Sequence, residues 1–115
     1  MIKEYFGGLD FGSSGAKISI INCKEKVIYN EFSSYLCEFQ NPQGWIFACS
    51  NLLKRIPKEL KKNLSRLSIS ATSGTLLACK FDGTNLGNAI PYNEICNRHK
   101  DRLNLIAGDN KFLNN

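Results

Sequence analysis

The sequence lacks long apolar runs, has a single histidine and contains no cysteine pair at C-x-x-C spacing. A membrane-spanning helix needs about 20 consecutive apolar residues, so we expect no membrane contact. A zinc site needs ligand pairs at short spacing, and Cys96 with His99 has no second pair to complete one. We therefore expect reduced, mostly buried thiols in a cytoplasmic protein. The five cysteines are Cys23, Cys37, Cys49, Cys79 and Cys96.

Two common nucleotide-binding patterns are also absent. Neither G-x-x-x-x-G-K-[ST] nor G-x-G-x-x-G occurs, which argues against P-loop and Rossmann-type sites. The net charge is +5, with most of the excess in one stretch. Its basic residues are Lys54, Arg55, Lys58, Lys61, Lys62 and Arg66. No aromatic residue is interleaved with them and no nucleic-acid-binding motif is present. We interpret the stretch as a solvated helix face and expect no nucleic-acid partner.

What the chain does have is the pattern of one α/β domain. Its 115 residues, 43% of them hydrophobic, are enough for a single core. Alternating apolar residues predict three strands joined by tight turns, at residues 5–9, 16–22 and 27–33. Ile18 and Ile20 should share one face of this antiparallel meander.

A helix should follow the meander, starting at Asn41 and Pro42 and ending at Pro57, which lacks an N–H. Its apolar residues at helical spacing are Trp45, Ile46, Cys49, Leu52, Leu53 and Ile56. We expect this stripe to cover one face of the sheet and a short helical turn to follow at residues 58–63.

The rest of the chain predicts further elements. They are strands at residues 67–72 and 75–81, an extended stretch at 86–92, a helix at 94–107 and a frayed tail at 108–115. The strand after the first helix should pair in parallel with the first strand through a crossover. The order β-β-β-α-β predicts a mixed sheet in a ribonuclease-H-like α/β domain.

The turn between the first two predicted strands carries polar groups suited to phosphate. Asp10 closes the first strand, and Gly12 permits a positive φ and close approach of a ligand. Ser13, Ser14 and Lys17 add hydroxyls and an ammonium group. Asp10 can only accept hydrogen bonds, so its natural partner is Mg²⁺ or a water on Mg²⁺. The same residues also suit a plain hairpin turn without a ligand, and that alternative stays open.

This loop resembles the D-x-G-[ST]-x-x-x-K first phosphate loop of the sugar kinase, Hsp70 and actin superfamily. A second segment, residues 67–94, runs as strand, Ser-Gly turn, apolar strand, Asp-Gly turn and Pro-Tyr-Asn-Glu. That order and spacing are similar to the FGGY family of carbohydrate kinases, xylulokinase-like members included. Residues 42–45, Pro-Gln-Gly-Trp, resemble the Pro-Gly-Trp that opens the family's first helix. The resemblance covers residues 8–99.

The resemblance implies an actin-like ATPase domain that uses ATP and Mg²⁺. The implied cofactor-binding residues are Asp10, Gly12, Ser13, Ser14 and Lys17, with Asp10 toward the metal. The implied sugar-site residues are Ser73, Gly74, Tyr92 and Glu94. Two features depart from the family: Glu94 stands where Asp is usual, and a Met-His-Gly-type insertion after the Ser-Gly turn is missing.

The family transfers a phosphoryl group from ATP to a sugar or polyol hydroxyl, with a carboxylate as base. That carboxylate and the second domain match nothing in this chain, so no catalytic residue is assigned. We expect residues 1–115 to be the N-terminal portion of domain I, incomplete without the C-terminal domain and inactive alone. The alternative is a non-catalytic remnant that binds a nucleotide or a protein partner, with its exposed half-core covered by oligomerisation.

Overall fold

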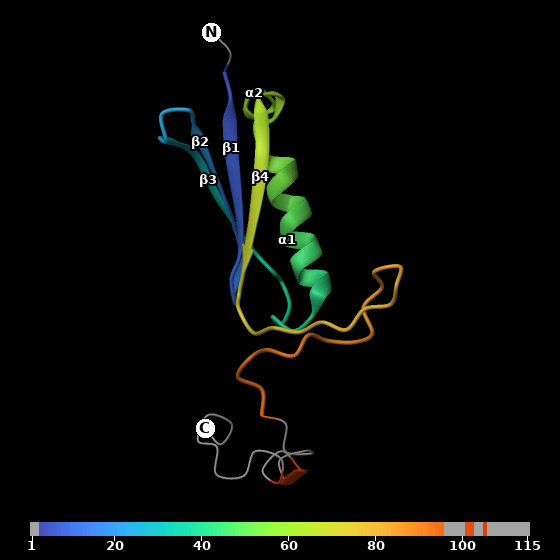
Figure 1. Cartoon of the computed structure of the whole chain (residues 1–115). Helices are drawn as coiled ribbons and strands as arrows, with labels where there is room; N and C mark the ends of the chain where they lie inside the picture. The colour runs from blue at the N-terminus through green and yellow to red at the C-terminus, as the bar shows by residue number, and fades with distance from the viewer. Residues whose placement is uncertain (1–2, 96–100, 103–104, 106–115) are drawn as a thin grey trace.

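The computed structural model describes residues 3–95, 101–102 and 105. Its elements are β1 (Tyr5–Phe11), β2 (Gly15–Asn22), β3 (Val27–Ser34), α1 (Pro42–Arg55), α2 (Lys58–Lys62) and β4 (Leu64–Ala71). The strands form one mixed sheet in the order β3-β2-β1-β4, and α1 runs along one face of it (Figure 1). β2 is antiparallel to both β1 and β3, whereas β4 is parallel to β1. The predicted meander, crossover and element order are confirmed.

Both ends of α1 follow from local sequence. The Asn41 side chain accepts a hydrogen bond from the Gln43 backbone N–H at 3.0 Å, which caps the helix. Pro42 occupies the first turn, where its missing N–H has no intrahelical partner to lose. Pro57 follows the helix and separates it from the single turn of α2. The predicted start, the predicted stop and the short second helix are confirmed.

The core lies between α1 and the β2–β3 half of the sheet. Its buried residues are Leu9, Ala16, Ile18, Ile20, Tyr35, Ala48, Leu52 and Ile56. Ile18 and Ile20 share the face toward α1, as predicted. The helix covers less of the sheet than its apolar stripe suggested, because Ile46 is exposed and so is Ile69 on β4.

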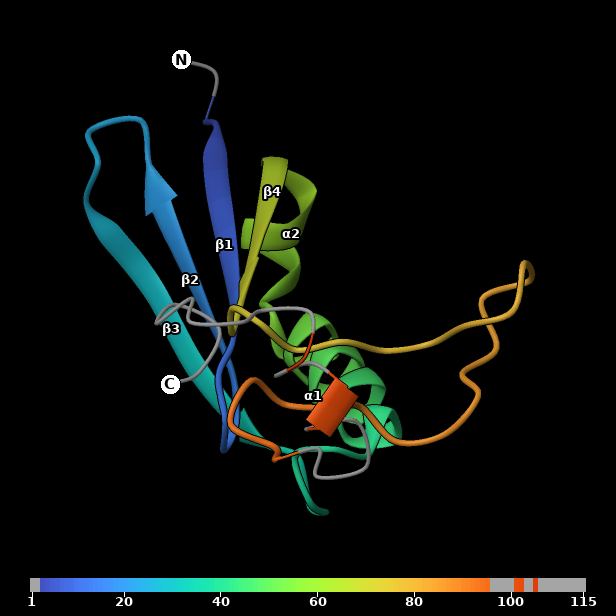
Figure 2. The same cartoon turned by 60° about the horizontal axis from the view of Figure 1, so that its bottom comes forward.

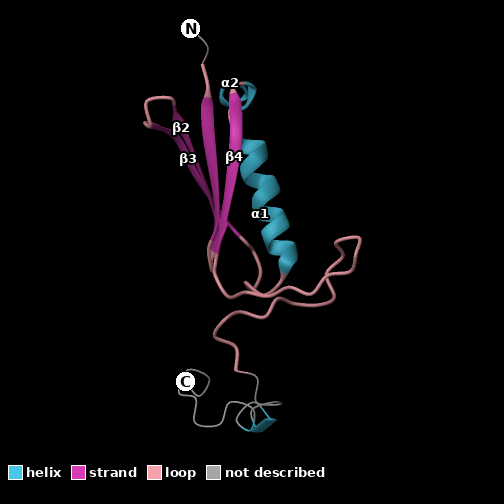
Figure 3. Ribbon diagram, viewed as in Figure 1, coloured by secondary structure: helices cyan, strands magenta, loops and turns pink. Residues whose placement is uncertain are grey.

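The predicted strand at residues 75–81 is wrong, and residues 86–92, expected to be extended, form no named strand either. These segments pair at two isolated bridges, Leu76 with Ile90 and Cys79 with Asn85. They form a long loop that projects from the body, drawn without strands in Figures 2 and 3. A two-stranded hairpin needs a packed second layer to be stable in water, and Phe81 at its tip is fully exposed.

The expectation of mostly buried cysteines is also wrong for those described. Cys23, Cys37 and Cys79 are exposed and Cys49 is half-buried. Cys23 lies in the turn between β2 and β3, and Cys37 lies in a bend between β3 and α1. Cys96 and His99 lie outside the described residues.

The predicted helix at 94–107 lies largely outside the described residues, as does the tail at 108–115. Of the described residues in that predicted helix, Asp101, Arg102 and Leu105 are helical, whereas Glu94 and Ile95 at its start are not. Within the described part of the chain, no helix has the length and apolar character to cross a bilayer.

Candidate functional site

The candidate site lies at the β1–β2 hairpin, where Asp10 and Lys17 are direct cross-strand partners. Both side chains are exposed. Their neighbours Leu9 and Ile18 are buried under α1, and side chains alternate along a strand. Asp10 and Lys17 therefore present a carboxylate and an ammonium group on the sheet face opposite α1.

Between these two charges the chain makes a tight turn with exposed hydroxyls. The Gly12 backbone N–H donates to the Gly15 carbonyl oxygen at 2.9 Å, which closes the turn and occupies that donor. Ser13 and Ser14 are exposed, and among the described residues neither backbone N–H finds an acceptor. The turn therefore offers two free N–H donors and two hydroxyls, a set that suits an anion.

Two details of the predicted loop need correction. Asp10 does not close its strand, because β1 continues through Phe11. Gly12 does not have a positive φ, since the antiparallel ladder continues to the pair Phe11 and Ala16 and leaves a turn that needs none there. A Cβ at Gly12 would meet only the Gly15 carbonyl oxygen, at 3.4 Å, so the glycine leaves room in front of the loop.

The glycine that the hairpin requires is Gly15, which the sequence did not single out. A Cβ there would lie 2.5 Å from both the Phe32 ring and the Ser33 carbonyl oxygen. Tyr35 was also missed: its hydroxyl donates to the Gly12 carbonyl oxygen at 2.6 Å. The sequence holds no signal for this contact, because the two residues are 23 positions apart.

The second set of predicted residues begins where β4 ends. The Thr72 backbone N–H donates to the Phe11 carbonyl oxygen at 3.1 Å, so Ser73 follows directly beside the end of β1. The carboxyl ends of parallel strands are where ligands bind in open α/β sheets. Both predicted sets thus lie at the same end of the sheet.

Within the second set, the structure brings Gly74 and Tyr92 into contact. Gly74 has φ +69°, and a Cβ there would lie 2.7 Å from the Tyr92 Cβ. Backbone hydrogen bonds of 2.9 and 2.8 Å between Leu76 and Ile90 hold the two segments together. Ser73, Tyr92 and Glu94 are exposed, as is Gly74, so all four residues are accessible.

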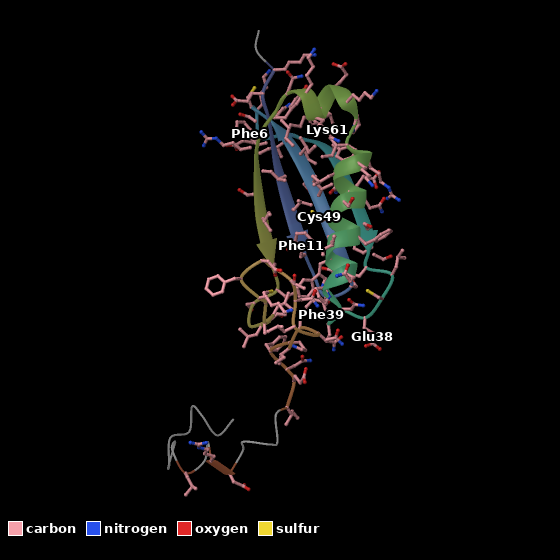
Figure 4. All side chains as sticks on the ribbon, turned by 90° about the vertical axis from the view of Figure 1, so that its right-hand side faces the viewer. Phe6, Phe11, Glu38, Phe39, Cys49 and Lys61 are labelled. Atoms are coloured by element: carbon pink, nitrogen blue, oxygen red, sulfur yellow. The ribbon has the colours of Figure 1, made fainter. Side chains whose placement is uncertain are left out.

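An open groove of about 630 Å³ lies on the other face of the sheet, between α1 and the end of β4. Its apolar lining residues include Phe11, Phe39, Trp45, Cys49, Leu53 and Leu77. Figure 4 labels Phe11, Phe39 and Cys49 of this set. The groove presents little that a polyhydroxylated substrate could bind by hydrogen bonds. It is an uncovered part of the core, and it adjoins the turn at residues 12–15, because Phe11 and Tyr35 both line it.

The basic stretch is at the opposite end of the sheet. Its six residues are all exposed, and Figure 4 places Lys61 near Phe6, far from Phe11 and Phe39. These charges are too distant to take part in the hairpin site, and their interpretation as a solvated face stays a prediction.

The donor set fits Mg²⁺ held together with phosphate. Mg²⁺ usually takes one or two carboxylates, several waters and phosphate oxygens rather than a cage of protein ligands. Asp10 supplies one exposed carboxylate beside the turn. Among the described residues, no three His, Cys, Asp or Glu side chains gather as a closed metal site would require.

No protein-family model matches the sequence, but solved structures do align with it. A xyloylose kinase from Brucella ovis matches 92% of this chain and 24% of its own, with TM-score 0.74 and 18% identity. Plasmodium falciparum glycerol kinase, solved with ADP, matches 93% and 23%, with TM-score 0.65 and 14% identity. Gluconate kinase from Lactobacillus acidophilus matches 76% and 19%, with TM-score 0.61 and 19% identity.

The chain has the ribonuclease-H-like fold of actin-like ATPases, as these kinases do. It spans about a quarter or less of the length of each of them. At these identities the likeness establishes the fold, and the activity of the neighbours is not thereby carried over.

Proposed function

We propose that this chain belongs to the FGGY carbohydrate kinases and corresponds to the N-terminal portion of their first domain. Such kinases move the terminal phosphoryl group of ATP to a sugar or polyol hydroxyl, with Mg²⁺ bound to the phosphates. The observation that carries the proposal is the β1–β2 hairpin. It places Asp10 opposite Lys17 on an exposed face, around a turn with free N–H donors, in a fold shared with three kinases.

The residues divide the work by their chemistry. The Ser13 and Ser14 N–H groups and hydroxyls donate to phosphate oxygens, and the Lys17 ammonium group offsets phosphate charge. The Asp10 carboxylate holds Mg²⁺, directly or through water. When bound, Mg²⁺ neutralises charge that develops on the transferred phosphate. Ser73, Gly74, Tyr92 and Glu94 form part of the wall against which the sugar or polyol binds.

The 115 residues alone should bind nucleotide without transferring phosphate. A kinase of this class needs a base that takes the proton of the substrate hydroxyl. The residues at the hairpin supply a metal ligand, phosphate donors and a cation, and none of them is assigned as that base. Sugar-dependent ATP turnover by the pure chain would contradict this part of the proposal.

The direct test is an ¹⁵N NMR titration of the chain with Mg-ATP and Mg-ADP. We expect shifts confined to the amides of residues 12–17, weakened when EDTA removes Mg²⁺. Asp10→Asn should abolish the Mg²⁺-dependent part. Glu38→Gln is the matched control, since it removes an equal charge from an exposed loop residue and should leave the titration unchanged. A folded wild-type chain that shows no shift at millimolar nucleotide would contradict nucleotide binding by this loop.

A second candidate function is a non-catalytic module that docks on another protein or on its own copy. The apolar groove between α1 and β4 favours it, because uncovered apolar surface of this kind commonly marks an interface. Sedimentation of the chain across a concentration series separates the two. A stable dimer with no nucleotide-dependent shift would support the module, whereas a monomer that binds Mg-ATP would support the kinase portion.

A further inference from the structure

Tyr35 is a buried tyrosine whose hydroxyl reaches the phosphate turn. It follows β3 directly, is 2% exposed and belongs to the hydrophobic core. Its hydroxyl donates to the Gly12 carbonyl oxygen at 2.6 Å. None of the groups proposed to touch nucleotide includes Tyr35, so its contact with the turn needs an explanation of its own.

The ring of Tyr35 is held in place by the segment that leads into α1. Its centroid lies 6.3 Å from that of Phe39, and Phe39 in turn packs on Trp45 at 5.9 Å. The Trp45 indole N–H donates to the Phe39 carbonyl oxygen at 2.8 Å. Gly44 lies close behind, because a Cβ there would be 2.9 Å from the Tyr35 Cβ. These contacts fix the position of the Tyr35 ring and therefore of its hydroxyl.

At Gly12 this hydroxyl completes the pairing of both backbone groups. The N–H of Gly12 donates to Gly15, and its carbonyl oxygen accepts from Tyr35. One residue earlier, the Phe11 carbonyl oxygen accepts from the Thr72 N–H. Three hydrogen bonds therefore hold the start of the turn: one from Thr72 after β4, one to Gly15 across the turn and one from the Tyr35 hydroxyl. Among the described residues, the N–H groups of Ser13 and Ser14 have no acceptor, so they are available to a ligand.

We propose that Tyr35 is a positioning residue that holds the β1–β2 turn in the conformation that presents Ser13 and Ser14 to phosphate. The inference rests on the proposed nucleotide-binding function of that turn. A donor loop that is ordered before binding loses less conformational entropy when the ligand arrives. Removing the hydroxyl alone should weaken Mg-ATP binding about 3- to 10-fold, the factor expected for one neutral hydrogen bond.

The protonation state of Tyr35 agrees with this role. Burial raises the pKa of its hydroxyl above the usual value, and the negative charge of Asp10 raises it further. The hydroxyl therefore remains a donor throughout the neutral range.

The test compares Tyr35→Phe with Tyr29→Phe in the full 115-residue chain. Tyr29 is a matched control: it packs against the same core from β3, but its hydroxyl makes no hydrogen bond to the turn among the described residues. Without ligand, Tyr35→Phe should increase the fast motion of the Ser13, Ser14 and Gly15 amides, measured by ¹⁵N relaxation. With Mg-ATP it should show the weaker binding stated above. Tyr29→Phe should do neither, whatever either variant does to the thermal midpoint.

The outcomes separate the two proposals. A more mobile turn in Tyr35→Phe together with a wild type that binds no nucleotide would support the role of Tyr35 in holding the turn, which we call the anchor, and overturn the proposed function. Equal turn motion and equal affinity in wild type and Tyr35→Phe would overturn the anchor and leave the proposed function standing. A lower thermal midpoint with an unchanged turn would show a packing role only and overturn the anchor.

A measurement on the wild type covers the case in which Tyr35→Phe does not fold. With tyrosine labelled at ¹³Cζ, the Tyr35 signal should shift when Mg-ATP binds, because its hydroxyl is bonded to the turn. The Tyr29 signal should stay in place. A Tyr35 signal that ignores bound nucleotide would overturn the inference.

Discussion

Leu9 on the central strand β1 has an isoleucine beside it on each neighbouring strand, and one of these is buried whereas the other is exposed. Ile18 of β2 and Ile69 of β4 are both register partners of Leu9 and point to the same face of the sheet. Ile18 is 0% exposed whereas Ile69 is 69% exposed. The difference is α1, which packs on β2 and β3. An alternating apolar pattern predicts which face a residue takes, and a second layer decides whether that face becomes core.

The same division runs through the candidate functional residues. The half under α1 holds the supports of the phosphate turn, Tyr35 and the β1–β2 ladder. The half around β4 holds Ser73, Gly74, Tyr92 and Glu94, which are exposed. We infer that the turn can be ordered by this chain alone, whereas the four residues predicted for a sugar site would form a pocket only if further protein covered the β4 half.

The largest expected effect compares Ile18→Ala with Ile69→Ala. Ile18→Ala leaves a cavity under α1 and should lower the free energy of unfolding by about 2–5 kcal/mol. Ile69→Ala removes atoms that already face water and should change it by about 0.5 kcal/mol or less. Urea unfolding followed by circular dichroism measures both.

Equal losses from the two substitutions would break the comparison. They would mean that the β4 half is covered in solution by a second copy of the chain. Repeating both measurements at ten-fold lower protein concentration tests this, because a cover formed by association is lost on dilution.

Much of the half of the sheet that α1 covers could be predicted from sequence, because the residues that determine its helix and strands lie close together in the chain. Asn41 and Pro42 start α1 through a cap and a fixed φ, and Pro57 ends it. The period-2 pattern of Ile18 and Ile20 gave the buried face of β2. Residues 75–81 have the same local signal for a strand, yet no regular strand forms there because a hairpin needs a layer to pack on.

The candidate site divides in the same way. Asp10, Ser13, Ser14 and Lys17 could be chosen from sequence because they lie within a few residues of one another. Tyr35 could not, because its contact with Gly12 depends on how β3 returns beside the hairpin. Gly15 was missed for the same reason: the Phe32 ring that requires it comes from another strand. Gly12 shows the opposite error, since a glycine in a loop does not by itself require a positive φ.

A second, smaller effect compares the packing at two single positions of the hairpin. Gly15 and Gly8 both lie in strands of the hairpin. A Cβ at Gly15 would run into Phe32 and the Ser33 carbonyl, whereas a Cβ at Gly8 would meet nothing within 4 Å. Gly15→Ala should cost about 1–3 kcal/mol of unfolding free energy through overpacking. Gly8→Ala should be neutral or slightly stabilising because it restricts the unfolded chain.

The same unfolding assay measures this pair, and the nucleotide titration adds a functional readout. Gly15→Ala should also disturb the amides of the phosphate turn, since Gly15 closes it. A Gly15→Ala protein as stable as Gly8→Ala would show that Phe32 moves aside, and that the hairpin is packed no more tightly than the β4 half.

The smallest expected effect is a loss of stability at alkaline pH that belongs to the covered half. Burial and the charge of Asp10 raise the pKa of Tyr35 above its usual value near 10. The fold thus favours the neutral hydroxyl, and this contribution is complete below about pH 10 and is lost as pH rises through the raised pKa. The difference in unfolding free energy between wild type and Tyr35→Phe should therefore shrink above about pH 10. Lysine ionisation is common to both proteins and cancels in that difference.

Asp10→Asn should weaken the effect, because it removes one of the two causes that raise the pKa of Tyr35. A difference that stays flat from pH 8 to 11 would mean that the Tyr35 hydroxyl faces water in solution, and the contrast between a packed half and an open half would then fail at the site itself.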